Sequence, residues 1–330
     1  MNGADAPRWA VTGAGGFVAQ HVIPRWLRRG PVLALCRPGG RRPRPVPAAP
    51  HPLRVVEVEL RDEVGLRRAL AGEALTGLVH LGAAASGQGE GRSIDEINVD
   101  GAIFAANALW ASAGSAGRGG SAGNPRSPGS PAFVQLSTGY VYGETPTPAD
   151  EDHPLQPIGA YARSKAEAER ALRAAAAGRP LLCLRAFNHA GPGQGPGYAL
   201  PDWAAALASG APMLHTGWLG ALRDISDVGA LAAAVDQLCA APAGWPPALN
   251  LCRGASISMG EALRALVDLS GRAGEISVIE GDLGRGGLRQ SRGSRALADR
   301  LGLPQSPPFA HTLRALLDEA QRAADGVHRA

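Results

Sequence analysis

A short apolar strand that runs straight into a glycine turn and then into a helix constrains this chain most. Residues 9–11 (Trp-Ala-Val) have the composition of a buried strand, and residues 12–19 form the turn Thr-Gly-Ala-Gly-Gly-Phe-Val-Ala. From Val18 to Arg29 the apolar residues recur at helical spacing. Glycines in such a turn let the backbone approach a pyrophosphate, which the helix N-terminus can then hold. The alternative is a plain glycine-rich turn, but its flanks favour a dinucleotide-binding unit.

Apolar runs and helical segments keep alternating up to residue 185. Strands are expected at 32–36, 55–60, 78–81, 133–138 and 181–185, and helices at 63–70, 94–109 and 161–177. This alternation predicts the α/β class, with a doubly wound parallel sheet of the Rossmann type. His80, inside an apolar run, is expected to be a core residue.

The predicted domain organisation has two parts. A Rossmann domain that binds NADP covers residues 1–185, and approximately 223–252 return to it; a smaller C-terminal substrate-binding lobe takes 186–222 and 253–330. Residues 112–131 are dominated by Gly, Ser, Ala and Pro, which predicts a flexible loop. In the second half, helices are expected at 199–209, 223–239, 259–270 and 311–324, and a strand at 248–252.

The end of the second predicted strand bears on the choice of cofactor. An acidic residue there would bind the ribose 2′-hydroxyl of NAD, but the strand ends in Arg37, and Arg41 and Arg42 follow. A guanidinium suits a 2′-phosphate. NADP is therefore preferred, with NAD as the alternative; Arg41 and Arg42 could also merely solvate a Pro-rich loop.

Tyr161 and Lys165 are the candidate catalytic pair. Residues four apart lie on one face of a helix, one turn from each other. An ammonium there would lower the phenol pKa toward working pH. Thr138 or Ser137, at the carboxyl end of a predicted strand, could orient a substrate oxygen. Taken alone the spacing is common by chance, and both side chains could belong to an ordinary helix surface.

Composition excludes several classes. The chain has 330 residues, a net charge of +4 and a pI near 9.2, but its arginines are scattered, which disfavours nucleic-acid binding and fits an anionic small ligand. The four cysteines show no C-x-x-C spacing and lie in or beside apolar runs, so we expect reduced core thiols and no metal site. Neither a signal-peptide pattern nor a membrane-length apolar stretch occurs, so a soluble cytoplasmic protein is expected.

Four motifs occur in one order and register. They are Thr12-Gly13-x-x-Gly16-Phe17, Ser137-Thr138-x-x-Val141-Tyr142-Gly143, Tyr161-x-x-x-Lys165 and Arg185-x-Phe187-Asn188. Together they resemble the extended short-chain dehydrogenase/reductase family, which comprises nucleotide-sugar epimerases, dehydratases and reductases. The likeness continues through residues 223–228 and 301–304, and so covers essentially the whole chain.

Within that family, residues 187–194 (Phe-Asn-His-Ala-Gly-Pro-Gly-Gln) look most like the GDP-6-deoxy-D-mannose reductases. The related 4,6-dehydratases carry an acid/base carboxylate after the catalytic threonine. Gly139 and Tyr140 occupy those places here, which speaks against a dehydratase.

The resemblance implies roles for individual residues. Tyr161 would be the general acid that protonates the oxygen as hydride reaches the 4-keto carbon. Lys165 would hold the nicotinamide ribose and lower the Tyr161 pKa. Thr138 matches the family's catalytic Ser/Thr better than Ser137 and would also contact substrate. His189 is given a structural role, and Asn98 no firm role.

The remaining implied contacts fall into two groups. The cofactor would be bound by Gly13, Gly16 and Phe17 at the pyrophosphate with Val18 beside them, by Arg37 at the 2′-phosphate, by Glu59 and Leu60 at the adenine, by Leu81 and Ala83 at the ribose, and by Phe187 near the nicotinamide amide. Asn188 and Arg223 would bind the diphosphate of the sugar nucleotide, although Asn188 could also be a turn residue. Residues 281–293 could clamp phosphates or form a plain loop.

These implications converge on the NADPH-dependent reduction of a nucleotide-linked 4-keto-6-deoxy sugar of the GDP-4-dehydro-6-deoxymannose type. One alternative is a nucleotide-sugar 4-epimerase with tightly bound NAD, and another is a catalytically quiet NADP-binding scaffold. The resemblance also implies a homodimer, formed through the helices that contain Asn98 and Tyr161.

Overall fold

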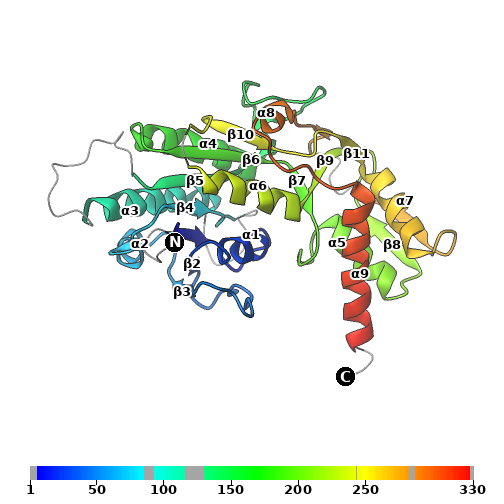
Figure 1. Ribbon diagram of the computed structural model, residues 1–330. Helices are drawn as coiled ribbons and strands as arrows, with labels where there is room; N and C mark the ends of the chain where they lie inside the picture. The colour runs from blue at the N-terminus through cyan, green and yellow to red at the C-terminus, as the bar shows by residue number, and fades with distance from the viewer. Residues whose placement is uncertain (1–5, 85–92, 116–129, 243, 282–286, 328–330) are drawn as a thin grey trace. The chain divides into compact units, whose positions relative to one another are not determined.

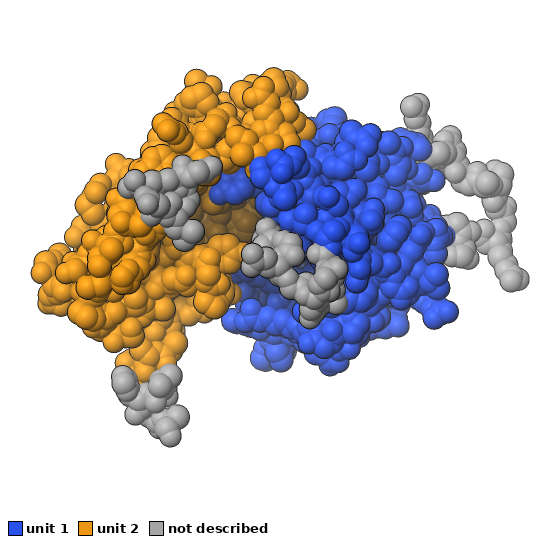
Figure 2. Space-filling view, turned by 180° about the vertical axis from the view of Figure 1, so that it is seen from behind, with its two compact units in different colours: residues 1–141, 159–185, 235–249 blue, residues 142–158, 186–234, 250–330 orange. Residues whose placement is uncertain are grey.

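The computed structural model describes residues 6–84, 93–115, 130–242, 244–281 and 287–327. The chain divides into two compact units (Figure 2). Unit 1 comprises Met1–Val141, Gly159–Arg185 and Val235–Leu249, and unit 2 comprises Tyr142–Ile158, Ala186–Ala234 and Asn250–Ala330. Most of the predicted loop at 112–131 lies outside the described residues.

A seven-stranded sheet has the order β10-β6-β5-β4-β1-β2-β3 (Figure 1). Its strands are β1 (Trp9–Thr12), β2 (Val32–Cys36), β3 (Leu53–Glu57), β4 (Gly77–His80), β5 (Ala132–Thr138), β6 (Leu181–Ala186) and β10 (Ala248–Leu251). β1 pairs in parallel with β2 on one side and β4 on the other. The chain order thus reverses at β1, and ligands of doubly wound sheets bind beside the carboxyl ends of such strands. The predicted fold class is confirmed.

Several boundaries in this unit differ from the prediction, and two of them have a clear cause or consequence. β3 ends at Glu57, short of residue 60, because its partner β2 ends at Cys36, which is paired with Glu57. The helix expected at 94–109 contains a π-helical turn, η1 (Glu96–Asp100), and continues as α3 (Gly101–Ser115). Helix therefore covers the first four residues of the predicted loop at 112–131.

The helices of unit 1 cover the sheet with apolar faces. α1 (Ala19–Trp26) buries Val22, Ile23 and Trp26. A core cluster joins Leu78 and Phe133 of the sheet to residues of α2 (Glu63–Leu70), of α3 and of α4 (Ala160–Ala176). All four cysteines are free and buried, which confirms the predicted core thiols.

Unit 2 has its own core, in which α5 (Ala199–Ala208), α7 (Met259–Ser270) and α9 (Phe309–Val327) pack together (Figure 1). The helix predicted at 223–239 is wrong at its start: Leu222–Asp227 forms strand β9, and α6 (Val228–Ala240) begins after it. Asp227 ends the strand because its carboxylate accepts hydrogen bonds from the backbone N–H groups of Gly229 and Ala230. The remaining short elements are β7 (Asn188–Ala190), β8 (Met213–Thr216), β11 (Ser256–Ser258), β12 (Ser277–Glu280), β13 (Gln290–Ser291), α8 (Ala296–Arg300) and η2 (Gly139–Tyr142).

Candidate active site

The glycine turn after β1 is shaped by close backbone contacts. Gly13 has φ +63°, and a Cβ on it would lie 2.7 Å from the backbone nitrogen of Gly82, which follows β4. A Cβ on Gly15 would lie 1.8 Å from the carbonyl oxygen of Arg41. Side chains at these two positions would therefore push apart the segments that follow three neighbouring strands.

Thr12 and His80 tie the ends of β1 and β4 together. The Thr12 hydroxyl lies 2.9 Å from His80 Nδ1 and accepts a hydrogen bond of 3.3 Å from the Gly82 N–H. Burial lowers the pKa of His80 to about 3, so the imidazole is neutral. The prediction that His80 is a core residue is confirmed, since it is fully buried.

A cavity of about 570 Å³ opens beside this turn, between the ends of β1, β2 and β4. Its volume falls in the range of roughly 300–1,000 Å³ that ligand pockets occupy. Seven of the residues predicted to bind the cofactor line it: Gly13, Gly16, Arg37, Glu59, Leu60, Leu81 and Ala83.

Arg41, which was considered for the 2′-phosphate, also lines the cavity. The other lining residues were not predicted, and several follow strand ends: Gly15, Leu35, Cys36, Gly40, Val58, Arg61, Gly82, Ala84 and Ile97. Of the three arginines considered at the β2 end, Arg37 and Arg41 line the cavity, whereas Arg42 forms an exposed ion pair with Glu57 at 2.6 Å. Phe17 and Val18 lie outside the lining; Val18 is the N-cap of α1, and Phe17 packs edge-on against His21.

Thr138, Tyr161 and Lys165 all belong to unit 1, where α4 packs on β5. Lys165 Nζ donates a 2.8 Å hydrogen bond to the carbonyl oxygen of Leu136, two residues before Thr138. Since β5 ends at Thr138, this hydrogen bond fixes the Lys165 amine near the end of the strand where Thr138 lies. The Thr138 hydroxyl accepts a 3.2 Å hydrogen bond from the Tyr140 N–H.

Lys165 is unusual because it is buried and because it is a lysine in a chain whose other basic residues are arginines. Only 2% of it is exposed, and burial lowers its pKa to about 8. It is also the sole lysine of the chain; the other 32 residues in the Lys and Arg total of 33 are arginines. Arg and Lys are not interchangeable at a tight polar site. If the single lysine were placed at random among the 33 positions that hold Lys or Arg, it would fall at position 165 once in 33 cases.

Hydrogen bonds hold two further polar residues, Ser137 and Asn98, near Tyr161 and Lys165. Ser137, the other hydroxyl considered, donates to the carboxylate of Glu169 at 2.5 Å. Asn98, which had no firm predicted role, lies fully buried in the π-helical turn η1. Its Nδ2 donates to Ser164 Oγ at 2.9 Å, and its Oδ1 accepts from the Ala84 N–H at 2.8 Å. Asn98 therefore connects the cavity wall to the turn of α4 that carries Lys165.

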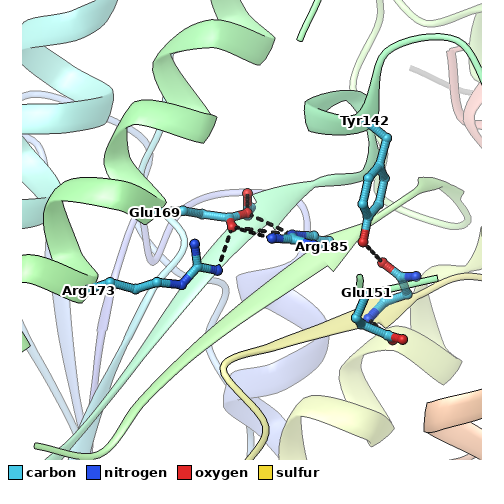
Figure 3. Close-up of polar contacts among 7 residues, drawn as sticks. Tyr142, Glu151, Glu169, Arg173 and Arg185 are labelled. Carbon is cyan, nitrogen blue, oxygen red and sulfur yellow. Dashed lines mark hydrogen bonds and ion pairs between the residues drawn. The ribbon is translucent and has the colours of Figure 1, made fainter. Parts of the chain in front are cut away.

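The remaining predicted site residues belong to unit 2. Phe187 is buried and stacks on Tyr142 with ring centroids 6.1 Å apart. The hydroxyl of Tyr142, which is labelled in Figure 3, donates to Asn250 Oδ1 at 2.7 Å. Asn188 begins β7. Arg223 lies on β9, and its guanidinium donates to the carbonyl oxygens of Leu222, Leu288 and Arg289.

Neither a membrane span nor a metal site emerges from the described residues. None of their helices is long and apolar enough to cross a bilayer. Among them, His, Cys, Asp and Glu form no group of three that could hold a metal ion. Of the segment 281–293, residues 282–286 lie outside the description, and residues 290 and 291 form β13.

Comparison with known proteins shows which family this chain belongs to. The family model of the NAD dependent epimerase/dehydratase family matches residues 9–252. The GDP-6-deoxy-D-mannose reductase of Pseudomonas aeruginosa is 31% identical over 199 residues, which are 57% of this chain and 65% of that protein, just under two thirds of its length.

Two solved structures share the fold over nearly the whole chain. The structure of RMD from Pseudomonas aeruginosa complexed with NADPH has a TM-score of 0.75 and 25% identity, covering 98% of this chain and 100% of that one. The UDP-glucose 4-epimerase of Thermus thermophilus in complex with NAD has a TM-score of 0.79 and 25% identity, covering 96% of this chain and 99% of that one.

Proposed function

The chain belongs to the NAD dependent epimerase/dehydratase family, and on that premise we propose that it is an NADPH-dependent reductase of a nucleotide-linked 4-keto-6-deoxy sugar, of the GDP-4-dehydro-6-deoxymannose type. The observation that carries the proposal is the placement of Lys165. The chain's one lysine is buried on the helix of Tyr161 and hydrogen-bonded to the strand that ends in Thr138.

The cavity supports a dinucleotide cofactor. Its glycine turn leaves backbone exposed beside the N-terminus of α1, which suits a pyrophosphate. Arg37 and Arg41 line the same cavity at the end of β2, where a 2′-phosphate would meet two guanidinium groups. These arginines favour NADPH over NADH.

The chemistry follows from the residues on β5 and α4. NADPH, when bound, would supply the hydride that reduces the 4-keto carbon. Tyr161 would donate its phenolic proton to the carbonyl oxygen, and Thr138 would orient that oxygen with its hydroxyl. The Lys165 ammonium would stabilise the phenolate that remains and favour proton release from Tyr161.

A reductase is favoured over a dehydratase by the residues that follow Thr138. Gly139 and Tyr140 begin the 3₁₀ turn η2, so no carboxylate occupies these two places. Elimination of water needs an acid/base there, whereas hydride delivery followed by protonation needs only Tyr161.

The fold similarity to an NAD-bound 4-epimerase supports a second candidate, a nucleotide-sugar 4-epimerase that regenerates its own NAD. The two functions differ in their use of cofactor. An epimerase consumes no net NADPH, because the hydride that it removes returns to the same substrate.

The family resemblance also supports a homodimer built from the helices of Asn98 and Tyr161. Light scattering on the purified chain should then give twice the 33.8 kDa mass of one chain. A mass of one chain at micromolar concentration would contradict the dimer.

The experiment that tests the function follows NADPH oxidation by the purified protein across GDP-, dTDP- and UDP-linked 4-keto-6-deoxy sugars. We expect one NADPH oxidised per sugar reduced, fastest with the GDP-linked sugar and slower with NADH. Tyr161→Phe should lose roughly 100-fold or more of the rate, since general acid catalysis contributes about 10²–10⁴-fold. Retained NAD with no NADPH consumption would exclude the reductase, and full activity of Tyr161→Phe would exclude the assigned general acid.

A further inference from the structure

The helix that carries Tyr161 and Lys165 also carries a carboxylate inside the protein. Glu169 lies one helical turn after Lys165 and is completely buried. Figure 3 shows the guanidinium groups of Arg173 and Arg185 converging on it. Both Arg185 Nη2 and Arg173 Nη2 donate to Glu169 Oε2 at 2.9 Å, and Ser137 Oγ donates to Oε1 at 2.5 Å.

The partners of Glu169 establish its charge. Two guanidinium groups and a hydroxyl all donate to it, and an ionised carboxylate accepts on both oxygens. An ionised group is stable in the protein interior only where its partners replace water. Here they come from α4, from β5 and from β6, so one negative charge is fixed beside the strand end that carries Thr138.

The groups that face Lys165 differ in charge. His80, on β4, is neutral because burial lowers its pKa to about 3. Cys183, on β6, stays a thiol because burial raises its pKa to about 12. Glu169, on the same helix, is ionised, and its charge raises the pKa of Lys165 against the larger opposite effect of burial.

We propose that Glu169 is a positioning residue of the Tyr161–Lys165 site, which holds the end of β5 through Ser137 and keeps the buried Lys165 amine in its ammonium form. A buried amine readily loses its proton. Without the Glu169 charge, a larger share of Lys165 would be neutral at working pH, and the neutral amine cannot stabilise a phenolate. The inference takes the roles of Tyr161 and Lys165 from the proposed function, but the electrostatic coupling of Glu169 to Lys165 needs no substrate.

The lone lysine makes this coupling directly measurable. Protein grown with ¹³C-labelled lysine carries the label at Lys165 alone, so its side-chain NMR signal reports the protonation of that amine. In the unaltered protein the signal should titrate near pH 8. In Glu169→Gln the midpoint should fall by about one pH unit, the lower end of what an opposite charge at this range contributes.

The matched control is Glu167→Gln, the same substitution two residues away on the exposed side of α4, where Glu167 pairs with Arg170. This variant should titrate like the unaltered protein. A Lys165 midpoint that does not move in Glu169→Gln, or that falls equally in Glu167→Gln, would overturn the proposal.

Folding of the variant needs a safeguard, because Glu169→Gln leaves the buried Arg185 without its anion. The double variant Glu169→Gln, Arg185→Gln removes both charges of the pair, and its Lys165 midpoint is measured in the same way. Because the loss of the Arg185 cation would itself raise the Lys165 pKa, the double variant is compared with Arg185→Gln alone. A lower Lys165 midpoint in the double variant than in Arg185→Gln supports the coupling, and equal midpoints overturn it.

NADPH affinity, measured against pH by fluorescence, links the coupling to the site. It should weaken above pH 8 in the unaltered protein and about one pH unit lower in the variant. If the lysine midpoint moves while this profile stays in place, Glu169 acts outside the site and the proposal fails. A chain that shows the shift but reduces no keto sugar would contradict the proposed function and leave the coupling intact.

Discussion

Unit 1 holds two polar regions built in opposite ways. Missing side chains help to shape the cofactor cavity, since five glycines line it: Gly13, Gly15, Gly16, Gly40 and Gly82. The cluster beneath α4 is filled with charged side chains, of which Glu169 and Arg185 are almost completely buried. The first region therefore depends on the space that absent side chains leave, whereas the second depends on charges held at fixed positions. Added atoms should disable the cavity, and charges that are lost or displaced should disable the cluster.

The largest expected effect comes from an added side chain at Gly13. In Gly13→Val the new Cβ would lie 2.7 Å from the Gly82 nitrogen at φ +63°, so the turn must open. We expect NADPH affinity to fall about 100-fold or more, since the opened turn would lose backbone hydrogen bonds to the pyrophosphate, and each hydrogen bond to a charged group contributes about 1.5–3 kcal/mol. Binding is measured by the quenching of NADPH fluorescence.

Gly39→Val provides the control for backbone strain. Gly39 has nearly the same φ, +64°, but nothing lies within 4 Å of an added Cβ. If this variant loses as much affinity as Gly13→Val, strain rather than crowding explains the loss, and the cavity is not defined by missing side chains.

The second effect tests the charge cluster with a substitution that keeps the charge. Lys165→Arg retains a cation, but a planar guanidinium does not fit a site that buries all but 2% of the lysine. We expect the turnover number to fall roughly 100-fold, comparable to the contribution of a positioned proton donor. Arg163→Lys, at an exposed place on the same helix, should leave turnover unchanged. Equal turnover of Lys165→Arg would mean that charge alone suffices.

The smallest effect is expected at the cavity rim, where charge also contributes. Arg37→Ser should weaken NADPH binding about 10-fold and leave NADH binding unchanged, because a hydrogen bond to a charged group contributes about 1.5–3 kcal/mol. The comparison variant is Arg42→Ser, since Arg42 pairs with Glu57 outside the cavity. Equal loss of NADPH affinity in both variants would point to general electrostatic attraction instead of a phosphate contact.

Much of the fold follows from local pattern. The helices at 63–70 and 259–270 have the predicted bounds; the first begins at the Asp62 cap, and the second at a capping box of Ser258 and Glu261. Helix 223–239 failed at its start because β9 is defined by pairing with β7, β11 and β13, which lie far away in the sequence. Other strands of unit 2 have only two to four residues, which is too few to show the alternation of apolar and polar side chains that predicts a strand.

Site residues that directly follow a predicted strand could be identified from the sequence. Residues that reach the site through contacts between distant segments could not. Several cavity residues after β1 and β2 were predicted from the glycine motif and from the order of the strands. Arg61 and Ile97 were not predicted, because only the folded chain brings them to the cavity. The link between Glu169 and Arg185 joins a helix to a strand 16 residues later. One signal was available without the structure: the only lysine of the chain stands four residues after Tyr161.

The central claim is that hydride moves from NADPH to a sugar carbon while Tyr161 protonates the oxygen. The most direct measurement supplies NADPH with deuterium at both C4 positions of the nicotinamide, together with the GDP-linked 4-keto-6-deoxy sugar, and analyses the sugar product by mass spectrometry and proton NMR. We expect one deuterium, bound at C4 of the reduced sugar. A product without deuterium, or an epimerised sugar formed with no NADPH consumed, would contradict the central claim.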